Sequence, residues 1–409
     1  MSWIADLHIH SHNSIATSKD CNLQQLYRWA GLKGVSLVGT GDFTHPGWRQ
    51  ELKKQLVAAE SGFYRLVDSP KPEIPNQPDV RFVISGEIST VYKKKGKTRK
   101  VHHLVVLPSL EAAESIANKL EERGFNLRSD GRPILGFDSY YLLDLILNLC
   151  PEVIFIPAHI WTPHFSVFGS KSGFDDLTEC YEDLTTCIFA LETGLSSDPA
   201  MNWQWSALDR FQLVSNSDAH NPQNLAREAN LFAAEFSYRG LANALQGKGE
   251  DHFLGTIEFF PEEGKYHYDG HRNCDLCWEP SQTRAAGGIC PKCGKPVTIG
   301  VLNRLNELAD RPYGYRPEGA KEFQRLIPLR QIIATGLGMG ENSQRVKQIY
   351  YQLLAEFGPE ISILRDVAVN DLEEKAGIRI STAIKRLRNG NVTIQPGYDG
   401  VYGSISVFD

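Results

Sequence analysis

The sequence predicts an α/β protein built on a barrel of seven strands, followed by a small cysteine-rich insert and a helical C-terminal region. Three observations support this prediction. Short apolar runs alternate with amphipathic segments up to about residue 250, two Cys-x-x-Cys pairs follow, and helical periodicity returns from residue 301. Apolar strands that alternate with amphipathic helices indicate a parallel sheet covered by helices.

The seven strand-like runs are separated mainly by segments with helical periodicity. The expected strands are Trp3–His8, Val35–Thr40, Val80–Ser85, His103–Leu107, Val153–Ala158, Ile188–Glu192 and Gln212–Ser217. The expected helices are Asn22–Leu32, Leu110–Arg123, Ser139–Cys150 and Pro222–Leu231. Seven such strands favour a barrel over an open sheet, and a barrel of this type carries its chemistry at the C-terminal ends of its strands.

The composition changes after about residue 250. Residues 255–300 are rich in Gly, Pro, aromatic residues and Cys, which suggests a small insert organised by a metal. We then expect helices at Val301–Asp310, Glu341–Phe357 and Ala383–Asn389. Residues 391–407 alternate like strands and are broken by Pro-Gly and Asp-Gly, which predicts a terminal hairpin.

The overall composition excludes several classes of protein. The chain has 409 residues and a formal net charge of −6, so a nucleic acid would have to be bound by local patches. No apolar run approaches the length of a membrane span. The N-terminus lacks a basic stretch followed by an apolar one, so no signal peptide is visible and we expect a cytoplasmic protein.

Side chains that bind metals stand at or near the ends of most expected strands. They are His8, His10, Asp42, His45, Glu87, His102, His103, His159, Asp218 and His220. His8 and His10 point the same way in an extended segment, because side chains alternate along a strand. Imidazoles with carboxylates suit borderline divalent ions such as Zn²⁺, Mn²⁺ or Fe²⁺. Two or three adjacent ions would be suited to hydrolysis, including phosphoryl displacement.

His103 precedes an apolar run directly, and we therefore favour it over His102 as a ligand. Since His103 starts its strand instead of ending it, that strand is expected to run antiparallel to the strand carrying Glu87. Glu192 also ends a strand. It either supports a ligand from behind or caps the next helix.

Four cysteines form a second expected metal site. Cys274, Cys277, Cys290 and Cys293 have the spacing of a closed tetrahedral site for one structural Zn²⁺. Such a site has no open position, so it would organise structure and not carry out hydrolysis. Residues 258–271, just before it, are rich in aromatic, basic and His side chains, which suit either base stacking or packing against the insert.

A basic segment joins Glu87 to His103 and is expected to form a hairpin. Its cationic residues are Lys93, Lys94, Lys95, Lys97, Arg99 and Lys100, and they would neutralise backbone phosphates unless the hairpin is only a solvated tip. The segment after His159 contains Trp161 and Lys171 and is a candidate for gripping or wedging an extruded base.

The ligand string resembles the polymerase-and-histidinol-phosphatase (PHP) phosphoesterases, whose distorted seven-stranded barrel holds three metal ions. The resemblance implies one ion on His8, His10, Glu87 and Asp218, a second on Glu87, His103 and His159, and a third served by His220. The family has a His directly after the Asp of its second motif. Here Phe43 follows Asp42, so either Asp42 or His45 would serve the third ion.

The whole chain resembles the endonuclease Q family within the PHP class. The matching runs are Gly-Asp-Phe-Thr-His-Pro, Glu-Glu-Gly-Lys-Tyr-His-Tyr-Asp-Gly-His and Pro-Gly-Tyr-Asp-Gly-Val-Tyr-Gly. Three domains are expected, with a phosphoesterase barrel at 1–252, a zinc-binding domain at 253–300 and a helical domain at 301–409. The resemblance implies a DNA repair nuclease that cuts on the 5′ side of deaminated bases (uracil, hypoxanthine, xanthine) and of abasic sites.

For such an enzyme we expect catalysis by Asp218, Glu87, His8 and His10, with two or three divalent ions (zinc, manganese or magnesium) in the barrel. Two alternatives are a small-molecule phosphatase, such as a histidinol-phosphate phosphatase, and a noncatalytic DNA-binding module. The C-terminal residues Ile405–Asp409 either dock a replication clamp or pack as a strand.

Overall fold

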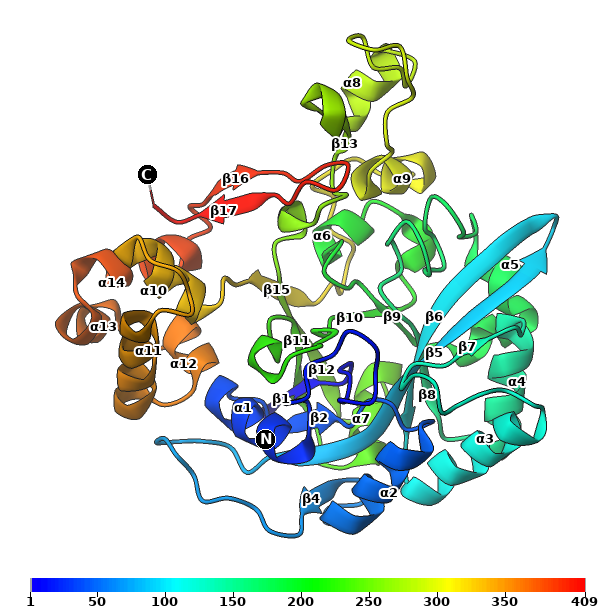
Figure 1. Ribbon diagram of the computed structural model, residues 1–409, viewed down its shortest axis with the longest axis horizontal. Helices are drawn as coiled ribbons and strands as arrows, with labels where there is room; N and C mark the ends of the chain where they lie inside the picture. The colour runs from blue at the N-terminus through cyan, green and yellow to red at the C-terminus, as the bar shows by residue number, and fades with distance from the viewer. Residues whose placement is uncertain (1, 409) are drawn as a thin grey trace.

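The computed structural model describes residues 2–408, and its main element is a mixed sheet (Figure 1). The hydrogen-bonded strands run in the order β12 (His252–Glu258), β11 (Ala229–Ala233), β1 (Ser2–Asp6), β2 (Leu37–Gly39), β5 (Arg81–Lys94), β6 (Lys97–Leu107) and β8 (Ile154–Pro157). Strands β1, β2 and β5 are parallel, whereas β11 and β6 run antiparallel to their neighbours. The expected antiparallel pairing of the His103 strand with the Glu87 strand is therefore confirmed.

A second sheet of two parallel strands, β9 (Ala190–Glu192) and β10 (Gln212–Val214), completes the seven expected strands. A backbone bond from Ile160 to Glu192, of 3.0 Å, links the segment after β8 to the end of β9. The mixed α/β class is confirmed. Within the described residues the β9–β10 ladder stays separate from the main sheet, so a continuous seven-stranded barrel is not established.

Helices begin where the sequence provides capping side chains. Asn22, Ser109 and Asp138 accept backbone N–H bonds at the starts of α1 (Leu23–Lys33), α3 (Leu110–Glu122) and α4 (Ser139–Leu149). These three helices agree with the sequence prediction within two residues. Helix α2 (Pro46–Gln55), capped by His45, was not predicted.

The expected helix at Pro222–Leu231 is wrong. Residues Pro222–Asn224 form a single 3₁₀ turn, and β11 follows at Ala229–Ala233. Strand β11 fills the space between β1 and β12 and pairs with both. Pairing with a buried neighbouring strand outweighs local helical pattern in such a case.

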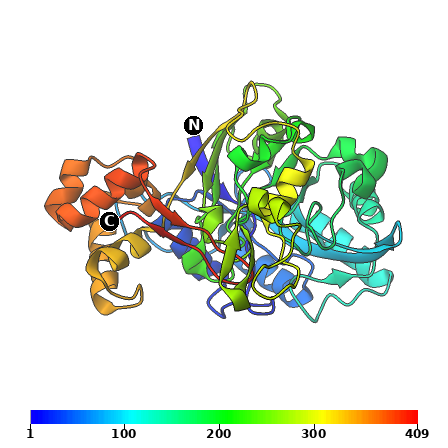
Figure 2. The ribbon, with the colours of Figure 1, turned by 90° about the horizontal axis from the view of Figure 1, so that it is seen from above.

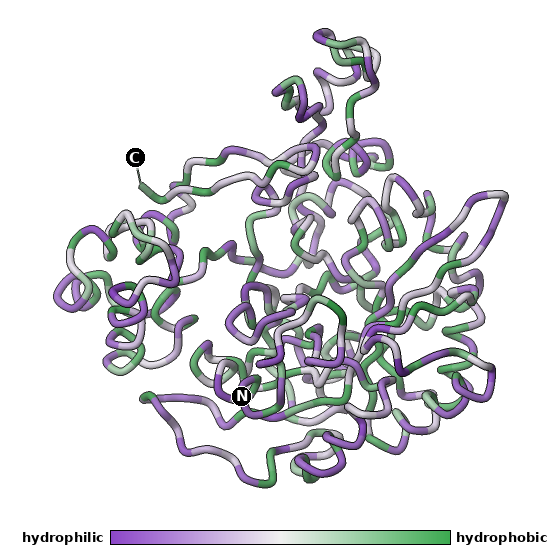
Figure 3. The backbone as a smooth tube through the Cα atoms, in the orientation of Figure 1, coloured by the Kyte–Doolittle hydropathy of each residue, from purple (hydrophilic) through white to green (hydrophobic). Residues whose placement is uncertain are grey.

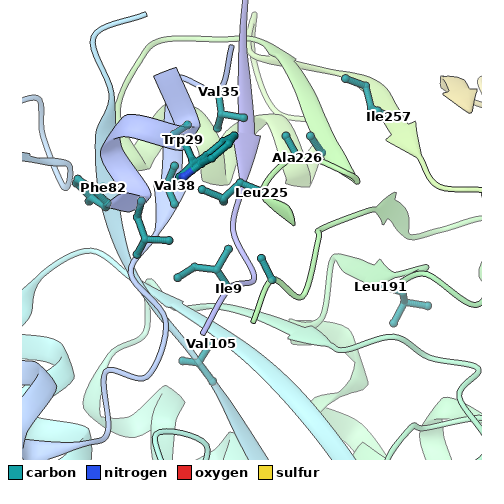
Figure 4. Close-up of a cluster of buried hydrophobic side chains, with 14 of the residues drawn as sticks. Ile9, Trp29, Val35, Val38, Phe82, Val105, Leu191, Leu225, Ala226 and Ile257 are labelled. Carbon is teal, nitrogen blue, oxygen red and sulfur yellow. The ribbon is translucent and has the colours of Figure 1, made fainter. Parts of the chain in front are cut away.

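The hydrophobic core lies between the sheet and the helices that cover it. Figure 4 shows Trp29 of α1 beside Val35, Val38 and Leu225, while Leu191 and Ile257 come from β9 and β12. In Figure 3 the β5–β6 arm becomes hydrophilic toward its tip. The strands are thus fixed by apolar burial, which leaves their ends to carry polar groups.

Residues 269–299 form a small unit that projects from the rest (Figure 1), and we call it the cysteine module. It contains β13 (Asp269–His271), β14 (Leu276–Trp278) and α8 (Pro280–Ala285). Strand β12, which covers the expected start of the zinc-binding segment, instead pairs with β11 in the main sheet.

The C-terminal helices lie to one side of the sheet in both Figure 1 and Figure 2. They follow α9 (Val301–Leu308) and β15 (Glu322–Arg325), and they are α10 (Leu329–Leu337), α11 (Gln344–Phe357), α12 (Glu360–Arg365), α13 (Val369–Ala376) and α14 (Ile378–Arg388). A buried ion pair of 2.8 Å between Lys33 and Glu360 joins α1 to α12.

The expected terminal hairpin is present as β16 (Thr393–Gln395) and β17 (Ser404–Ser406). Ile405 and Val407 are buried, which agrees with strand packing of this tail. Of the segment proposed for clamp docking, Asp409 lies outside the described residues. Among residues 2–408, the helices are too short or too polar to cross a membrane.

Candidate metal centre

The chain continues beyond β1 in a way that brings distant ligands together. Ile9 forms a parallel bridge with Ala219, and the backbone N–H of His10 donates to the carbonyl of Ala219 at 3.0 Å. His8 and His10 therefore flank the residue that pairs with the Asp218–His220 segment. Both imidazoles are fully buried.

Ten expected ligands reduce to three compact groups of side chains. In each group the ligand atoms lie within 4.8 Å of one another, and the groups are His8, His10 and Glu87; Glu87, His102 and His159; and His10, Asp218 and His220. Glu87 belongs to two groups and His10 to two. This sharing is the arrangement expected of a cluster of adjacent cations bridged by common ligands.

Carboxylates behind the first two histidines fix their rings. His8 Nδ1 lies 3.0 Å from both oxygens of Glu192, and His10 Nδ1 lies 3.1 Å from Asp42 Oδ1. The opposite nitrogens, Nε2, then face Glu87 and Asp218. Ligating histidines are usually oriented by such a partner on the other ring nitrogen. Of the two roles expected for Glu192, the structure shows the supporting one.

Asp42 supports the centre and does not join a ligand group. One oxygen accepts from the backbone and hydroxyl of Ser11, at 2.7 and 2.6 Å, and from the hydroxyl of Ser14, at 2.9 Å. His45 lies outside the centre, where it caps α2 and its Nε2 is 3.2 Å from the carbonyl of Arg128. The expectation that Asp42 or His45 completes the third group is therefore not met, because His10, Asp218 and His220 form that group.

The structure places His102, and not the favoured His103, in a ligand group. His102 and His103 are adjacent on β6, and adjacent strand residues face opposite sides of a sheet. His102 Nδ1 lies 2.5 Å from Glu87 Oε1, whereas the His103 ring is held between Thr90, at 3.0 Å, and Tyr181, at 2.9 Å. Burial lowers the pKa of His102 to about 4, although Glu87 opposes this.

The buried carboxylates of the centre stay ionised. Burial alone would raise the pKa of Glu87, but His102, His159 and His8 hold it well below its usual value. The pKa of Asp218 is likewise lowered, against the effect of burial, by His10 and His8. The same contacts act on the histidines, because Asp218 and Asp42 raise the pKa of His10 to about 9 although burial opposes this.

Three residues of the centre adopt backbone conformations that are uncommon outside glycine. Asp42, His159 and Asp218 have φ values of 50°, 29° and 47°. Such conformations cost roughly 1–3 kcal/mol each and are concentrated at functional sites. The surrounding fold holds them in place, which supports a functional origin.

The donor set fits divalent cations. His8 Nε2 is buried without a hydrogen-bond partner in the described structure and points toward Glu87 and Asp218, at 3.7 and 3.8 Å. A buried nitrogen in this state costs free energy unless something binds it. Imidazole nitrogens and carboxylate oxygens are suitable ligands for zinc, manganese or iron.

Two cavities adjoin the centre. One, of about 540 Å³, is lined by His102, His159, Asp218 and Arg132. The other, of about 570 Å³, is lined by Tyr266, His267 and Tyr402 together with Lys171. Thr162, His164, Leu195 and Ser196 line both cavities, so the two are adjacent.

Arg132 was not among the sequence candidates. It donates from Nη1 to Glu87 Oε2 at 3.2 Å, and its pKa is raised by Glu87 although burial opposes this. No motif in the sequence indicates this residue. Arg132 and Glu87 come into contact only because the loop after α3 packs against the sheet.

The basic hairpin is present, but its cations differ in accessibility. Lys93, Lys95 and Lys97 are exposed, and Lys95 also pairs with Glu179 at 3.1 Å, whereas Lys94 is partly buried and pairs with Glu182 at 2.8 Å. Arg99 is buried with its guanidinium 4.1 Å from the centre of the Phe174 ring, and Lys100 lies 5.1 Å from that of Phe165.

Trp161, expected to contact DNA, lies in the core in this conformation. Its side chain is fully buried, and its indole N–H donates to Asn202 at 2.7 Å. Its apolar ring packs near Phe168 and Trp205 in the core. Lys171 lines the second cavity, where DNA that approaches the centre could contact it.

The cysteine module gathers three of the four expected cysteines. Its ligand group is His271, Cys274, Cys290 and Cys293, and Cys277 lies outside it with Sγ 4.0 Å from the carbonyl of Pro396. Desolvation would raise the pKa of the Cys290 thiol, but the backbone amides of Lys292 and Cys293 lower it. The set of thiols and one imidazole fits a structural zinc ion.

Comparisons with known proteins agree with this architecture. Residues 328–391 match the family described as the MJ0043 C-terminal domain. The chain is 28% identical to YqxK of Bacillus subtilis over 98% of both proteins. It is also 28% identical to MJ0043 of Methanocaldococcus jannaschii over 254 residues, which span 60% of this chain and 31% of that longer protein.

Two solved structures match almost the whole chain. The lesion-specific endonuclease PfuEndoQ from Pyrococcus furiosus has a TM-score of 0.87 and 32% identity, with 99% of this chain and 95% of that chain covered. A complex of Endonuclease Q with a 27-mer duplex carrying an abasic lesion at the active site has a TM-score of 0.86 and 32% identity, with coverage of 100% and 97%. The chain belongs to the endonuclease Q family.

Proposed function

We propose that this protein is a metal-dependent DNA repair endonuclease, which hydrolyses the phosphodiester on the 5′ side of deaminated bases and abasic sites. The observation that carries the proposal is Glu87, a fully buried carboxylate shared by two ligand groups. His102 and His159, its partners in one of these groups, line a cavity of about 540 Å³. The related Endonuclease Q complex holds an abasic duplex at its active site.

Three groups of side chains would hold the ions. His8, His10 and Glu87 would bind one; Glu87, His102 and His159 a second; and His10, Asp218 and His220 a third. Bound divalent ions would supply Lewis acidity and charge neutralisation at a phosphodiester. This assignment replaces His103 by His102 and makes Asp42 and Glu192 supporting groups.

The chain's own residues prepare this chemistry before substrate arrives. Glu192 holds Nδ1 of His8 and Asp42 holds Nδ1 of His10, so Nε2 of His8 faces Glu87 and Nε2 of His10 faces Asp218. Asp218, whose side chain is 31% exposed, is the most accessible carboxylate of the three groups and stays ionised. Fixed ligands of this kind avoid reorganisation during the reaction.

The second cavity suits recognition of a displaced base. Tyr266 and Tyr402 supply aromatic faces, and Lys171 and Lys265 supply positive charge. A damaged or unpaired nucleotide is less costly to extrude from a duplex than a paired one, and aromatic side chains stack on the extruded base. The adjacency of this cavity to the metal centre supports cleavage beside the lesion.

The test uses end-labelled duplexes with one uracil, hypoxanthine or abasic site, and an undamaged duplex as the control. We expect a single nick on the 5′ side of the lesion in the presence of Mg²⁺ or Mn²⁺, and no nick after chelation. Intact lesion DNA together with rapid turnover of histidinol phosphate would contradict the proposal.

A further inference from the structure

The loop at residues 128–133 runs past the metal centre and presents Arg132 to it. Its backbone is fixed by contacts from three other segments of the chain. These contacts are His45 Nε2 with Arg128 O (3.2 Å), Thr44 Oγ1 with Gly131 O (3.2 Å), Gly131 N with Asn13 O (3.0 Å), Ile15 N with Asp130 Oδ1 (3.1 Å) and Ser89 N with Pro133 O (3.0 Å). These contacts fix the backbone from which the Arg132 side chain extends.

Gly131 shows how closely the 128–133 loop approaches the metal centre. A Cβ atom at this position would lie 2.3 Å from Asp42 Oδ2 and 2.5 Å from Ser14 Oγ. Only glycine allows the backbone so near the carboxylate that orients His10. The next residue, Arg132, is in consequence held directly beside the ligand groups.

Arg132 combines a fixed position with access to the cavity. Its side chain is 27% exposed, whereas its partner Glu87 is fully buried. Among the described residues that line the 540 Å³ cavity, Arg132 is the only Lys or Arg. A guanidinium carries five N–H donors, so one bond to Glu87 orients the group and leaves donors for a second anion.

We propose that Arg132 binds the scissile phosphate and stabilises the negative charge that develops on its non-bridging oxygens during hydrolysis. The inference rests on the proposed function, because it takes the substrate to be a phosphodiester. The planar guanidinium matches two phosphate oxygens at once and keeps its proton throughout the reaction. Glu87 already faces His8, His102 and His159, so pairing with Glu87 alone does not account for a half-buried arginine that reaches the cavity.

The same geometry gives His45 and Thr44 a positioning role. His45 caps α2 through Nδ1 and contacts the carbonyl of Arg128 through Nε2, so one ring joins the helix to the loop. His45, three residues after Asp42, thus supports the 128–133 loop instead of binding a metal.

The experiment compares Arg132→Ala and Arg132→Lys with Arg128→Ala, an exposed arginine of the same loop that serves as the matched control. We expect Arg132→Ala to lower kcat for lesion duplexes roughly 10²–10³-fold, as loss of a transition-state donor does elsewhere. Metal content should stay unchanged, and Arg132→Lys should recover only part of the loss because an ammonium lacks the fork. Added guanidinium should restore part of the activity of Arg132→Ala.

Binding measured without turnover separates a phosphate contact from a structural role. The slope of log K against log salt for a lesion duplex should fall by about one in Arg132→Ala, since one phosphate contact is lost. Near-normal kcat, or a loss of bound metal with an unchanged slope, would overturn the inference. If the wild-type protein fails to cut any lesion duplex, the proposed function fails instead.

A double variant tests the positioning role of His45. His45→Asn keeps a side chain that caps helices but loses the reach to Arg128, and we expect roughly a tenfold loss of kcat from misplacement of Arg132. Combined with Arg132→Ala, it should cause little additional loss, because both changes act through one group. Losses that multiply would show that His45 acts independently of Arg132.

Discussion

The metal centre and the cysteine module are both groups of metal-binding side chains, but they are assembled in different ways. The centre draws ligands from residues 8 to 220, at strand ends and loops that the sheet brings together. The module draws its ligands from residues 271 to 293, a short local segment. Its buried hydrophobic cluster consists of Leu276, Cys290 and Val297.

This contrast predicts that only the cysteine module needs a bound metal for its structure. Ligands of the centre are oriented by Glu192, Asp42 and the apolar core of the sheet, so their geometry exists before a cation binds. The module has too few buried apolar groups to order itself, and in such small units the free energy of metal binding is the free energy of folding. Changes at the centre should therefore remove activity, and changes at the module should remove local structure.

Replacement of Asp218 should have the largest effect. Asp218→Asn keeps a side chain that tolerates the positive φ of this position but removes the charge facing His10 and His8. We expect cleavage of lesion duplexes to fall by roughly 10³-fold or more, since a member of a proposed metal-binding group is lost. DNA affinity and the unfolding midpoint should change little, as measured by fluorescence anisotropy and urea denaturation.

Asp68→Asn, at an exposed position, is the control for that change. Retained cleavage in Asp218→Asn would place the reaction elsewhere. A large loss of stability would instead contradict the view that the fold, and not the metal, assembles the centre.

The sequence predicted the strands and ligand residues of the metal centre better than the contacts between them. Apolar runs locate the seven expected strands and helices α1, α3 and α4, and the ligands at strand ends follow from them. The face on which His102 and His103 point depends on the register of β6, and the contact of Arg132 with Glu87 depends on a loop far away in the sequence. Such features arise from tertiary packing, which local patterns do not determine.

Replacement of Cys290 should have the largest structural effect. Cys290→Ser removes a buried thiol that belongs to both the ligand group and the module's hydrophobic cluster. We expect the protein to lose about one zinc ion per chain and residues 269–299 to lose hydrogen-exchange protection, while the main sheet stays protected. Unchanged zinc content would contradict a metal-organised module, and unfolding of the whole chain would show that the two regions are not separable.

Replacements of His271 and of Cys277 should differ in how much they lower zinc affinity, and this effect should be smaller than that of Cys290→Ser. His271→Asn removes a member of the ligand group, whereas Cys277→Ser alters a thiol outside it. We expect zinc affinity, measured by competition with a chelator, to fall at least roughly tenfold more in His271→Asn than in Cys277→Ser. The opposite order would restore the four-cysteine site expected from the sequence.

The smallest expected effect is on the pH dependence of stability. It concerns Glu228 and Glu258, two buried carboxylates that, unlike Glu87, are not paired with histidines. Burial raises the pKa of Glu228 and of Glu258 well above the usual value, and the facing charges of Glu258 on Glu228 and of Asp198 on Glu258 add to this. Both are fully buried, as is Glu87, but Glu87 faces cations and stays ionised. In the unfolded chain these groups lose their protons near pH 4.5, so their contribution to stability is complete below that pH and is lost as pH rises through the folded-state pKa values.

Glu228→Gln should reduce this dependence on pH. Glutamine can still accept from the backbone N–H of Phe259, and its amide can donate toward Glu258, so the like-charge pair is relieved. We expect the free energy of unfolding at pH 8 to rise by about 1–3 kcal/mol relative to wild type, with little change at pH 5. Urea unfolding across this range, with the exposed Glu250→Gln as control, measures the effect. A parallel shift at both pH values would mean that Glu228 acts through packing, and the contrast with the ionised carboxylates of the centre would not hold.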